Sequence, residues 1–196
     1  MQLKSKNFYN MFSPFYPVID FFLKAQKREL FKKINGLEEG RVLEIGVGNG
    51  SHFALYKKHQ VVGIDTSSKM LARALVQKRS QNIELLEMSG ENLLFKENTF
   101  DYIILSHVIS VVPDTDKLMD EVYRVLKKGG KVFILNHFTP NNFLRYIDYG
   151  FNPFSKFFHF KSTFYVEKIE SLKQFKPIEE RELGYFSYYK LLIYEK

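Results

Sequence analysis

Short apolar segments alternate with longer amphipathic ones along most of this chain, and this alternation constrains the fold more than any other feature. The apolar segments predict five strands, at 41–45, Gln60–Asp65, Asn82–Glu87, Phe100–Leu105 and Lys131–Leu135. Segments with helical periodicity, such as Ser67–Arg79 and Asp114–Leu126, separate these strands. Strands that are apolar on both faces and alternate with helices are typical of a parallel sheet that is covered on both sides. With two closing strands at Ile178–Leu183 and Tyr188–Tyr194, the pattern predicts an α/β fold with a seven-stranded, mostly parallel sheet.

The remaining segments complete one domain. An amphipathic helix is predicted over Val18–Ile34, a helical stretch over about 51–58, and another helix over Ser162–Phe175. Lys127–Gly130 is expected to close the helix before it, because basic residues and glycine favour a helix C-terminus. No linker or internal repeat interrupts the 196 residues, so we predict one domain over 1–196.

Composition excludes several classes of chemistry. The chain has no cysteine, which excludes disulfides, zinc–thiolate sites, thiol nucleophiles and iron–sulfur clusters. The first ten residues lack the apolar core of a signal peptide, and the longest uncharged apolar run, Tyr102–Val112, is too short to span a bilayer. We therefore expect a cytoplasmic protein.

A glycine-rich loop follows the first predicted strand. It reads Glu44-Ile-Gly46-Val-Gly48-Asn-Gly50, and the second strand ends fifteen residues later in Asp65. Glycines allow a tight turn that brings backbone amides close to a ligand, and an acid at the end of the next strand can accept hydrogen bonds from ribose hydroxyls. The dinucleotide pattern Gly-x-Gly-x-x-Gly would need glycine where Ser51 stands, so the loop is Gly-x-Gly-x-Gly instead.

Over about residues 8–140 the chain resembles the class I S-adenosylmethionine (SAM) methyltransferases, whose glycine loop also opens with an acid. The resemblance implies their Rossmann-like fold, SAM as the cofactor, S-adenosylhomocysteine as the product, and no metal. The motifs that match, Glu44–Gly50, Gly63–Leu71 and Glu87–Leu93, together with the N-terminal segment and the end of the fourth strand, assign a set of cofactor-binding residues. They are Tyr9, Glu44, Gly46, Gly48, Gly50, Asp65, Thr66, Met70, Ser89, Gly90, Glu91 and Ser106.

Ser89 and Met70 differ from the other residues of this set. Ser89 stands where the family usually has Asp, and a hydroxyl accepts a hydrogen bond from the adenine amino group more weakly than a carboxylate does. A methionine such as Met70 is by itself more often a core residue, but its motif position favours contact with adenine.

Three further segments narrow the resemblance to bacterial phosphatidylethanolamine N-methyltransferases: Leu105–Asp114, Asn136-His137-Phe138 and, more loosely, Tyr9–Pro17. The resemblance implies methylation of the amine of phosphatidylethanolamine or a related phospholipid headgroup. The alternative is a SAM enzyme that methylates an amine or hydroxyl of a soluble small molecule. A nucleotide-binding module without catalytic activity, or a nicotinamide oxidoreductase, is the third interpretation.

Amine methylation needs alignment of the amine with the methyl group and loss of a proton, so a base is useful. His107, at the end of the fourth strand, is the first candidate, with anchoring of the loop as its structural alternative. His137, at the end of the fifth strand, faces the acceptor side in this interpretation, or is structural. Tyr9 borders the cofactor or the acceptor, or packs within a lid.

The net charge of +7 is concentrated near the N-terminus, because residues 1–33 hold seven basic and two acidic residues. Ten aromatic residues lie within 143–165. We therefore expect an N-terminal helical lid (1–35) and an aromatic-rich cap on the acceptor side (139–176). Together they would dock on an anionic membrane surface at the inner membrane face. The chain lacks the Pro-Pro-aromatic motif of nucleic-acid amino-methylases, so we expect no nucleic-acid partner, and a monomer or weak dimer.

Overall fold

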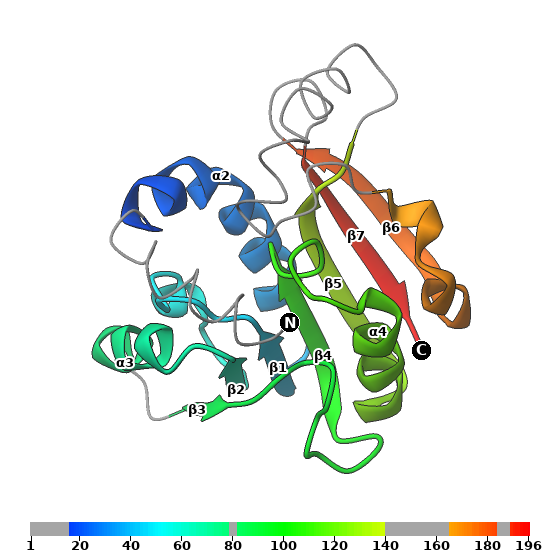
Figure 1. The fold of residues 1–196 in the computed structure, drawn as a ribbon, viewed down its shortest axis with the longest axis horizontal. Coiled ribbons are helices and arrows are strands. Elements are labelled where there is room, and N and C mark those ends of the chain that lie inside the picture. The colour runs from blue at the N-terminus through cyan, green and yellow to red at the C-terminus, as the bar shows by residue number, and fades with distance from the viewer. Residues whose placement is uncertain (1–15, 79–81, 140–164, 184–188) are drawn as a thin grey trace.

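The computed structural model describes residues 16–78, 82–139, 165–183 and 189–196, with side chains described from residue 26 onward. Seven strands form one sheet in the order β3-β2-β1-β4-β5-β7-β6 (Figure 1). β1 to β5 are parallel, whereas β7 runs antiparallel between β5 and β6. The strands are β1 (Arg41–Ile45), β2 (Gln60–Asp65), β3 (Ile83–Glu87), β4 (Phe100–Ser106), β5 (Leu126–His137), β6 (Lys176–Leu183) and β7 (Tyr189–Glu195). The predicted α/β fold is confirmed.

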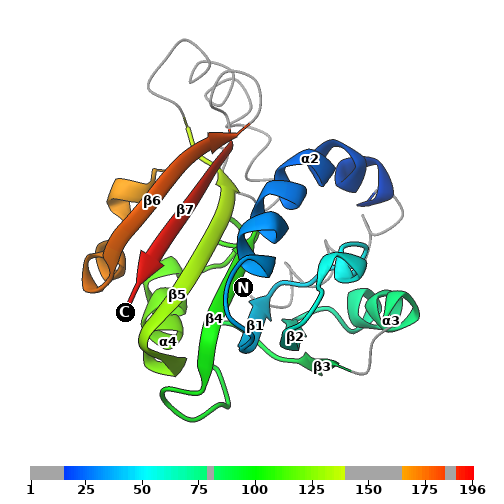
Figure 2. The same cartoon turned by 180° about the vertical axis from the view of Figure 1, so that it is seen from behind.

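Helices cover both faces of this sheet, as Figures 1 and 2 show from opposite sides. α4 (Thr115–Val125) and the 3₁₀ turns η3 (Val166–Lys168) and η4 (Glu170–Gln174) cover one face, over a core that includes Phe100 and Ile134. α2 (Tyr16–Asn35), α3 (Ser68–Gln77) and η2 (Phe53–Leu55) are on the other, over a core that includes Phe133 and Leu135. β1 buries four of its five residues between these two layers.

Local sequence explains where two helices begin. The Ser67 hydroxyl accepts a hydrogen bond from the Met70 amide at 3.3 Å and starts α3, and the Asp114 carboxylate accepts one from the Lys117 amide at 3.0 Å and starts α4. Both helices therefore begin where the predicted ranges Ser67–Arg79 and Asp114–Leu126 place their first residues.

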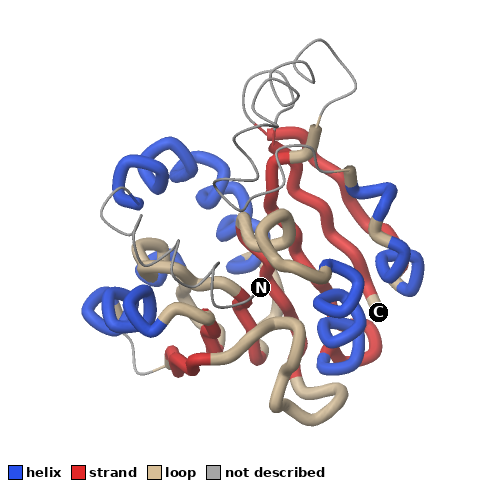
Figure 3. Tube along the Cα trace, in the orientation of Figure 1, coloured by secondary structure: helices blue, strands red, loops and turns tan. Residues whose placement is uncertain are grey.

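The helical stretch predicted over 51–58 is wrong, because only one 3₁₀ turn forms there (Figure 3). The Asn35 side chain explains where the turn ends. Its amide nitrogen donates to the Leu55 carbonyl at 2.8 Å, and its oxygen accepts from the Lys57 amide at 3.2 Å. These backbone groups are therefore not available to continue a helix.

The end of α4 also differs from the prediction. The helix stops at Val125, and 126–130 belong to β5, whose register with β4 shifts at this point. The carbonyls of Arg124 and Val125 accept hydrogen bonds from the Asn98 and Thr99 amides, which turns the chain toward β4. Gly129, with φ +72°, serves this bulge and not a helix cap.

The helix predicted over Ser162–Phe175 is not an α-helix where the structure describes it, since 166–174 form the two 3₁₀ turns. Ser171 donates its amide and its hydroxyl to one oxygen of Asp116, at 2.8 and 2.7 Å, which fixes η4 against α4. No helix among the described residues is long and apolar enough to cross a membrane.

Candidate active site

The glycine loop leaves β1 at the carboxyl edge of the parallel strands. Gly46, Gly48 and Gly50 all have positive φ, at +78°, +57° and +70°, which side chains other than glycine rarely adopt. The amides of Gly46 and Val47 donate to the carbonyl of Ile64, at 2.8 and 3.1 Å, so the loop is fastened to the end of β2.

Gly46 also brings two loops together. A Cβ atom at Gly46 would lie 2.7 Å from the side chain of Val108, in the turn after β4. A Cβ at Gly50 would lie 2.6 Å from the ring of Phe53 and 3.0 Å from the backbone of Ala74. The glycines therefore permit both the turn and its close packing.

Asp65 ends β2 beside this loop. Its carboxylate oxygens accept hydrogen bonds from the amides of Gly48 at 2.9 Å and Ser67 at 2.8 Å. Burial raises the pKa of Asp65, against the lowering effect of these amides and that of Thr66. A carboxylate has about four acceptor positions, so capacity is left for a ribose hydroxyl.

Glu44 is buried, at 1% exposure, and both of its oxygens have polar neighbours. The Tyr56 hydroxyl donates to one oxygen at 2.9 Å, and Nε2 of His52 lies 2.7 Å from the other, as an electrostatic contact and not an aligned hydrogen bond. Burial would raise the pKa of Glu44, but His52, Tyr56 and Lys27 together lower it. Burial and the nearby Glu44 carboxylate raise the pKa of Tyr56 well above its usual value.

His52 and Tyr56 were not identified from the sequence. Their spacing of four residues, beside the acid of the glycine loop, was the available signal. The ring of Phe31 on α2 packs against both, with centroid distances of 5.4 Å to His52 and 4.7 Å to Tyr56. The Glu44 carboxylate therefore anchors the segment that follows the loop, and the Phe31 ring packs this segment against α2.

The loop after β3 carries Ser89, Gly90 and Glu91. The Ser89 hydroxyl accepts from the Glu91 amide at 3.3 Å, and the Glu91 carboxylate accepts from the Asp114 amide at 2.7 Å. A Cβ at Gly90 would lie 2.8 Å from the side chain of Ile45, so this loop packs directly against the end of β1.

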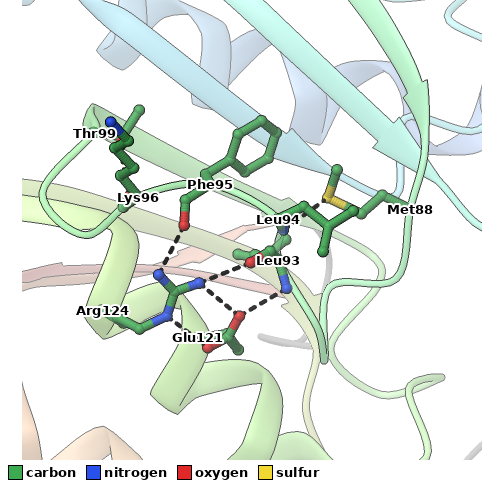
Figure 4. Close-up of polar contacts among 8 residues, drawn as sticks. All are labelled: Met88, Leu93, Leu94, Phe95, Lys96, Thr99, Glu121 and Arg124. Atoms are coloured by element: carbon green, nitrogen blue, oxygen red, sulfur yellow. Dashed lines mark hydrogen bonds and ion pairs between the residues drawn. The ribbon is translucent and has the colours of Figure 1, made fainter.

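An ion pair on α4 holds the next part of the same loop (Figure 4). Arg124 donates to both oxygens of Glu121, at 2.7 and 2.9 Å, and to the carbonyls of Leu93 and Phe95, each at 2.8 Å. Glu121 accepts in turn from the Leu93 amide at 2.7 Å. The hydrogen bonds of Arg124 lower the pKa of Glu121, and those of Glu121 raise the pKa of Arg124. The position of the 88–95 loop is thus set by α4.

Thr66 and Met70 follow Asp65 in the chain, Met70 within α3. Thr66 is exposed, but the Met70 side chain is only 1% exposed on α3. Such burial is typical of a core residue, and contact of Met70 with adenine stays a prediction.

β4 ends at Ser106, and His107 follows in a left-handed conformation with φ +58°. This conformation is uncommon for residues other than glycine and raises the backbone energy, so the surroundings must hold it. The His107 amide donates to the Leu135 carbonyl of β5 at 2.7 Å, and Val108 packs on Gly46. The turn therefore lies at the carboxyl edge of the sheet, with Val108 against the glycine loop and the His107 ring against Tyr189.

His137 ends β5 and is paired in register with Tyr189, the first residue of β7. The rings of Tyr189 and His107 are nearly perpendicular, with centroids 5.7 Å apart. The structure therefore brings both predicted histidines to one edge, with a tyrosine that the sequence analysis did not identify. Tyr9 lies outside the described residues.

These residues suit a nucleoside-containing cofactor. The carboxyl edge combines a loop of positive-φ glycines, a carboxylate with spare acceptor capacity, and a fixed second loop, from three neighbouring strands. Asp65 would hold the ribose, and Ser89 and Gly90 would border the base. Among the described residues, no group of three or more His, Asp or Glu side chains could hold a metal ion.

Comparison with known proteins agrees with this geometry. Residues 43–134 match the family model described as a methyltransferase domain. The phosphatidylethanolamine N-methyltransferase of Cereibacter sphaeroides is 33% identical over 151 residues, which cover 74% of each chain. The demethylmenaquinone methyltransferase of Oceanobacillus iheyensis is 28% identical over 144 residues, which cover 69% of this chain but only 60% of that protein.

Among solved structures, the phosphoethanolamine N-methyltransferase 2 of Haemonchus contortus, in complex with SAM, has a similar fold. The TM-score is 0.71 at 22% identity, over 87% of this chain and 52% of that one. The strand order, the glycine loop and the identity with curated enzymes lead to one conclusion. This chain belongs to the class I SAM-dependent methyltransferases.

Proposed function

We propose that this methyltransferase acts on the amine of phosphatidylethanolamine or a related phospholipid headgroup. The observation that carries the proposal is the 33% identity with the phosphatidylethanolamine N-methyltransferase of Cereibacter sphaeroides, which extends over most of both proteins.

The arrangement at the carboxyl edge supports this choice of acceptor. SAM supplies a methyl group on an activated sulfonium, so the protein has to align the nucleophile and remove a proton. A primary amine is largely protonated at neutral pH and reacts only when neutral. In this proposal His107 accepts that proton, and its strained turn holds the imidazole near the bound cofactor. His137 orients the acceptor on the next strand.

Docking on a membrane is part of the proposal, because a lipid amine is reached only at the bilayer surface. On α2, Lys33 and Glu29 form ion pairs with Glu179 and Arg181 of β6, at 2.6 and 3.1 Å. Arg28 and Lys32 are exposed on the same helix. We propose that residues 1–35 form a helical lid whose exposed basic side chains, such as Arg28 and Lys32, face anionic lipid. We also propose that the part of 139–176 before the 3₁₀ turns covers the acceptor. The turns themselves pack against α4 on the other face of the sheet and are not part of this cover.

A second candidate function is methylation of a carbon, amine or hydroxyl in another small acceptor. The similarity to the demethylmenaquinone methyltransferase of Oceanobacillus iheyensis favours a quinone-type acceptor. The two candidates differ in the acceptor molecule and, for a quinone-type acceptor, in the methylated atom, which is a ring carbon instead of a nitrogen.

Release of S-adenosylhomocysteine by the purified protein tests the proposal. The protein is incubated with SAM and vesicles of phosphatidylglycerol, with or without added phosphatidylethanolamine. Parallel reactions contain free ethanolamine, phosphoethanolamine or a demethylmenaquinone. We expect turnover only with the phosphatidylethanolamine vesicles, and a mass increase of the lipid by one methyl group. Turnover with the quinone or a water-soluble amine, and none with the lipid, would select the second candidate.

A further inference from the structure

The strand alternation places particular side chains on the α2 face of the sheet, at its carboxyl edge. Along β5, Phe133 and Leu135 belong to the core beneath α2, whereas Ile134 belongs to the core beneath α4. Side chains of a strand alternate between faces, so His137 lies on the α2 face.

Tyr189 lies on the same face and at the same edge. It packs against the core beneath α2, as do Leu191 and Ile193 further along β7. Because β7 is antiparallel to β5, it begins where β5 ends, and Tyr189 is the Cα partner of His137. Directly opposed residues on neighbouring strands have side chains in reach of each other.

His107, at the end of β4, contacts Tyr189 as well, so the start of β7 lies beside side chains from the ends of both β4 and β5. The rings of His107 and Tyr189 meet nearly perpendicularly, at 87°. Part of the Tyr189 side chain stays exposed at this edge. Tyr189 is half-buried, and burial raises the pKa of its phenol, so the ring is neutral at neutral pH.

A neutral aromatic ring at the carboxyl edge of the sheet can bind a cation formed in the reaction. Transfer of a methyl group from sulfonium to a neutral amine forms the N–C bond and breaks the S–C bond, so the positive charge passes to the acceptor nitrogen. Aromatic faces attract such alkylated ammonium groups. We propose that Tyr189 is a wall of the acceptor site that binds the ammonium group of the acceptor and product, and that it positions His107. This proposal rests on the proposed function, that the acceptor is an amine.

Three variants test the proposal. Tyr189→Phe keeps the ring, and Tyr189→Leu removes it. Tyr194→Leu is the matched control, because Tyr194 lies on the same strand but packs against the core beneath α4. The first measurement is inhibition of turnover on phosphatidylethanolamine vesicles by tetramethylammonium, and the second is the Kd of SAM by calorimetry.

We expect Tyr189→Leu to raise the Ki of tetramethylammonium and the KM of the lipid at least tenfold, with the Kd of SAM within twofold of wild type. Tyr189→Phe and Tyr194→Leu should keep Ki and KM within about threefold. An active Tyr189→Leu protein with unchanged Ki would overturn the proposal, and so would equal losses in Tyr189→Leu and Tyr194→Leu. Absence of turnover by the wild-type protein on any amine would instead refute the proposed function. In that case calorimetry with tetramethylammonium and S-adenosylhomocysteine still tests the aromatic wall.

Discussion

Replacement of His107 by asparagine separates the imidazole from the backbone turn that holds it. His107 has φ +58°, and the left-handed conformation costs an ordinary residue about 1–2 kcal/mol, but asparagine tolerates it better. The variant also loses the ring contact with Tyr189, which is worth about 0.5–1.5 kcal/mol. The two effects oppose each other, so we expect the free energy of unfolding to change by no more than about 1 kcal/mol.

The activity of His107→Asn should fall much more than its stability. Loss of a general base typically lowers the rate by about 10²–10⁴-fold, and we expect at least a tenfold fall in kcat, or about 1.4 kcal/mol in the barrier. The assay is S-adenosylhomocysteine release on phosphatidylethanolamine vesicles at saturating SAM, from about pH 6 to 9. The acid limb of the wild-type profile should disappear in the variant, while the Kd of SAM stays within threefold.

His107→Gly is the control for the backbone, because glycine adopts the left-handed conformation most readily. It should be as inactive as His107→Asn and equally able to bind SAM. Full activity of either variant would refute the role of His107 as a base. Loss of SAM binding in both would show instead that the side chain organises the cofactor site.

Three other perturbations test the cofactor site. Asp65→Ala should weaken SAM binding at least tenfold in calorimetry, whereas Glu84→Ala, at an exposed position on the neighbouring strand, should not; equal affinities would contradict the assignment of the ribose site. The pKa of Glu44 is lowered in the folded protein, so its stabilising effect is complete above its unfolded value of about 4.5 and is lost as the pH falls through the lower folded value. Glu44→Gln should therefore be less stable than wild type near pH 7 in urea unfolding, with a difference that narrows below about pH 4; a constant difference would mean that the charge is irrelevant. Gly46→Ala should lower stability and SAM affinity more than Gly129→Ala. Both glycines have positive φ, but only at Gly46 would the new Cβ atom clash with a neighbouring side chain, that of Val108. Equal effects of the two substitutions would show that backbone strain alone accounts for the loss.

Sequence periodicity predicted the sheet well, because the central strands are mostly apolar on both faces, a pattern that a doubly covered sheet buries. It also located the glycine loop and Asp65, since their spacing along the chain fixes them at adjacent strand ends. The helix predicted over 51–58 failed for a reason outside its own residues. Asn35, twenty residues before Leu55, takes the backbone hydrogen bonds that would have extended it.

The acceptor side could be predicted only in part. His107 and His137 were found because each lies at the carboxyl end of a strand. Tyr189 was missed because its place depends on β7 running antiparallel beside β5, a pairing between segments about fifty residues apart. His52 and Tyr56 were missed because their role comes from burial around Glu44, which local patterning does not reveal.

Labelled methyl transfer tests the central claim most directly. The protein is incubated with SAM carrying a ¹³C methyl group and with vesicles that contain both phosphatidylethanolamine and a demethylmenaquinone, and the extracted lipids are examined by ¹³C NMR. The proposed function predicts the label on the headgroup nitrogen of the phospholipid. Label on a ring carbon of the quinone would contradict it.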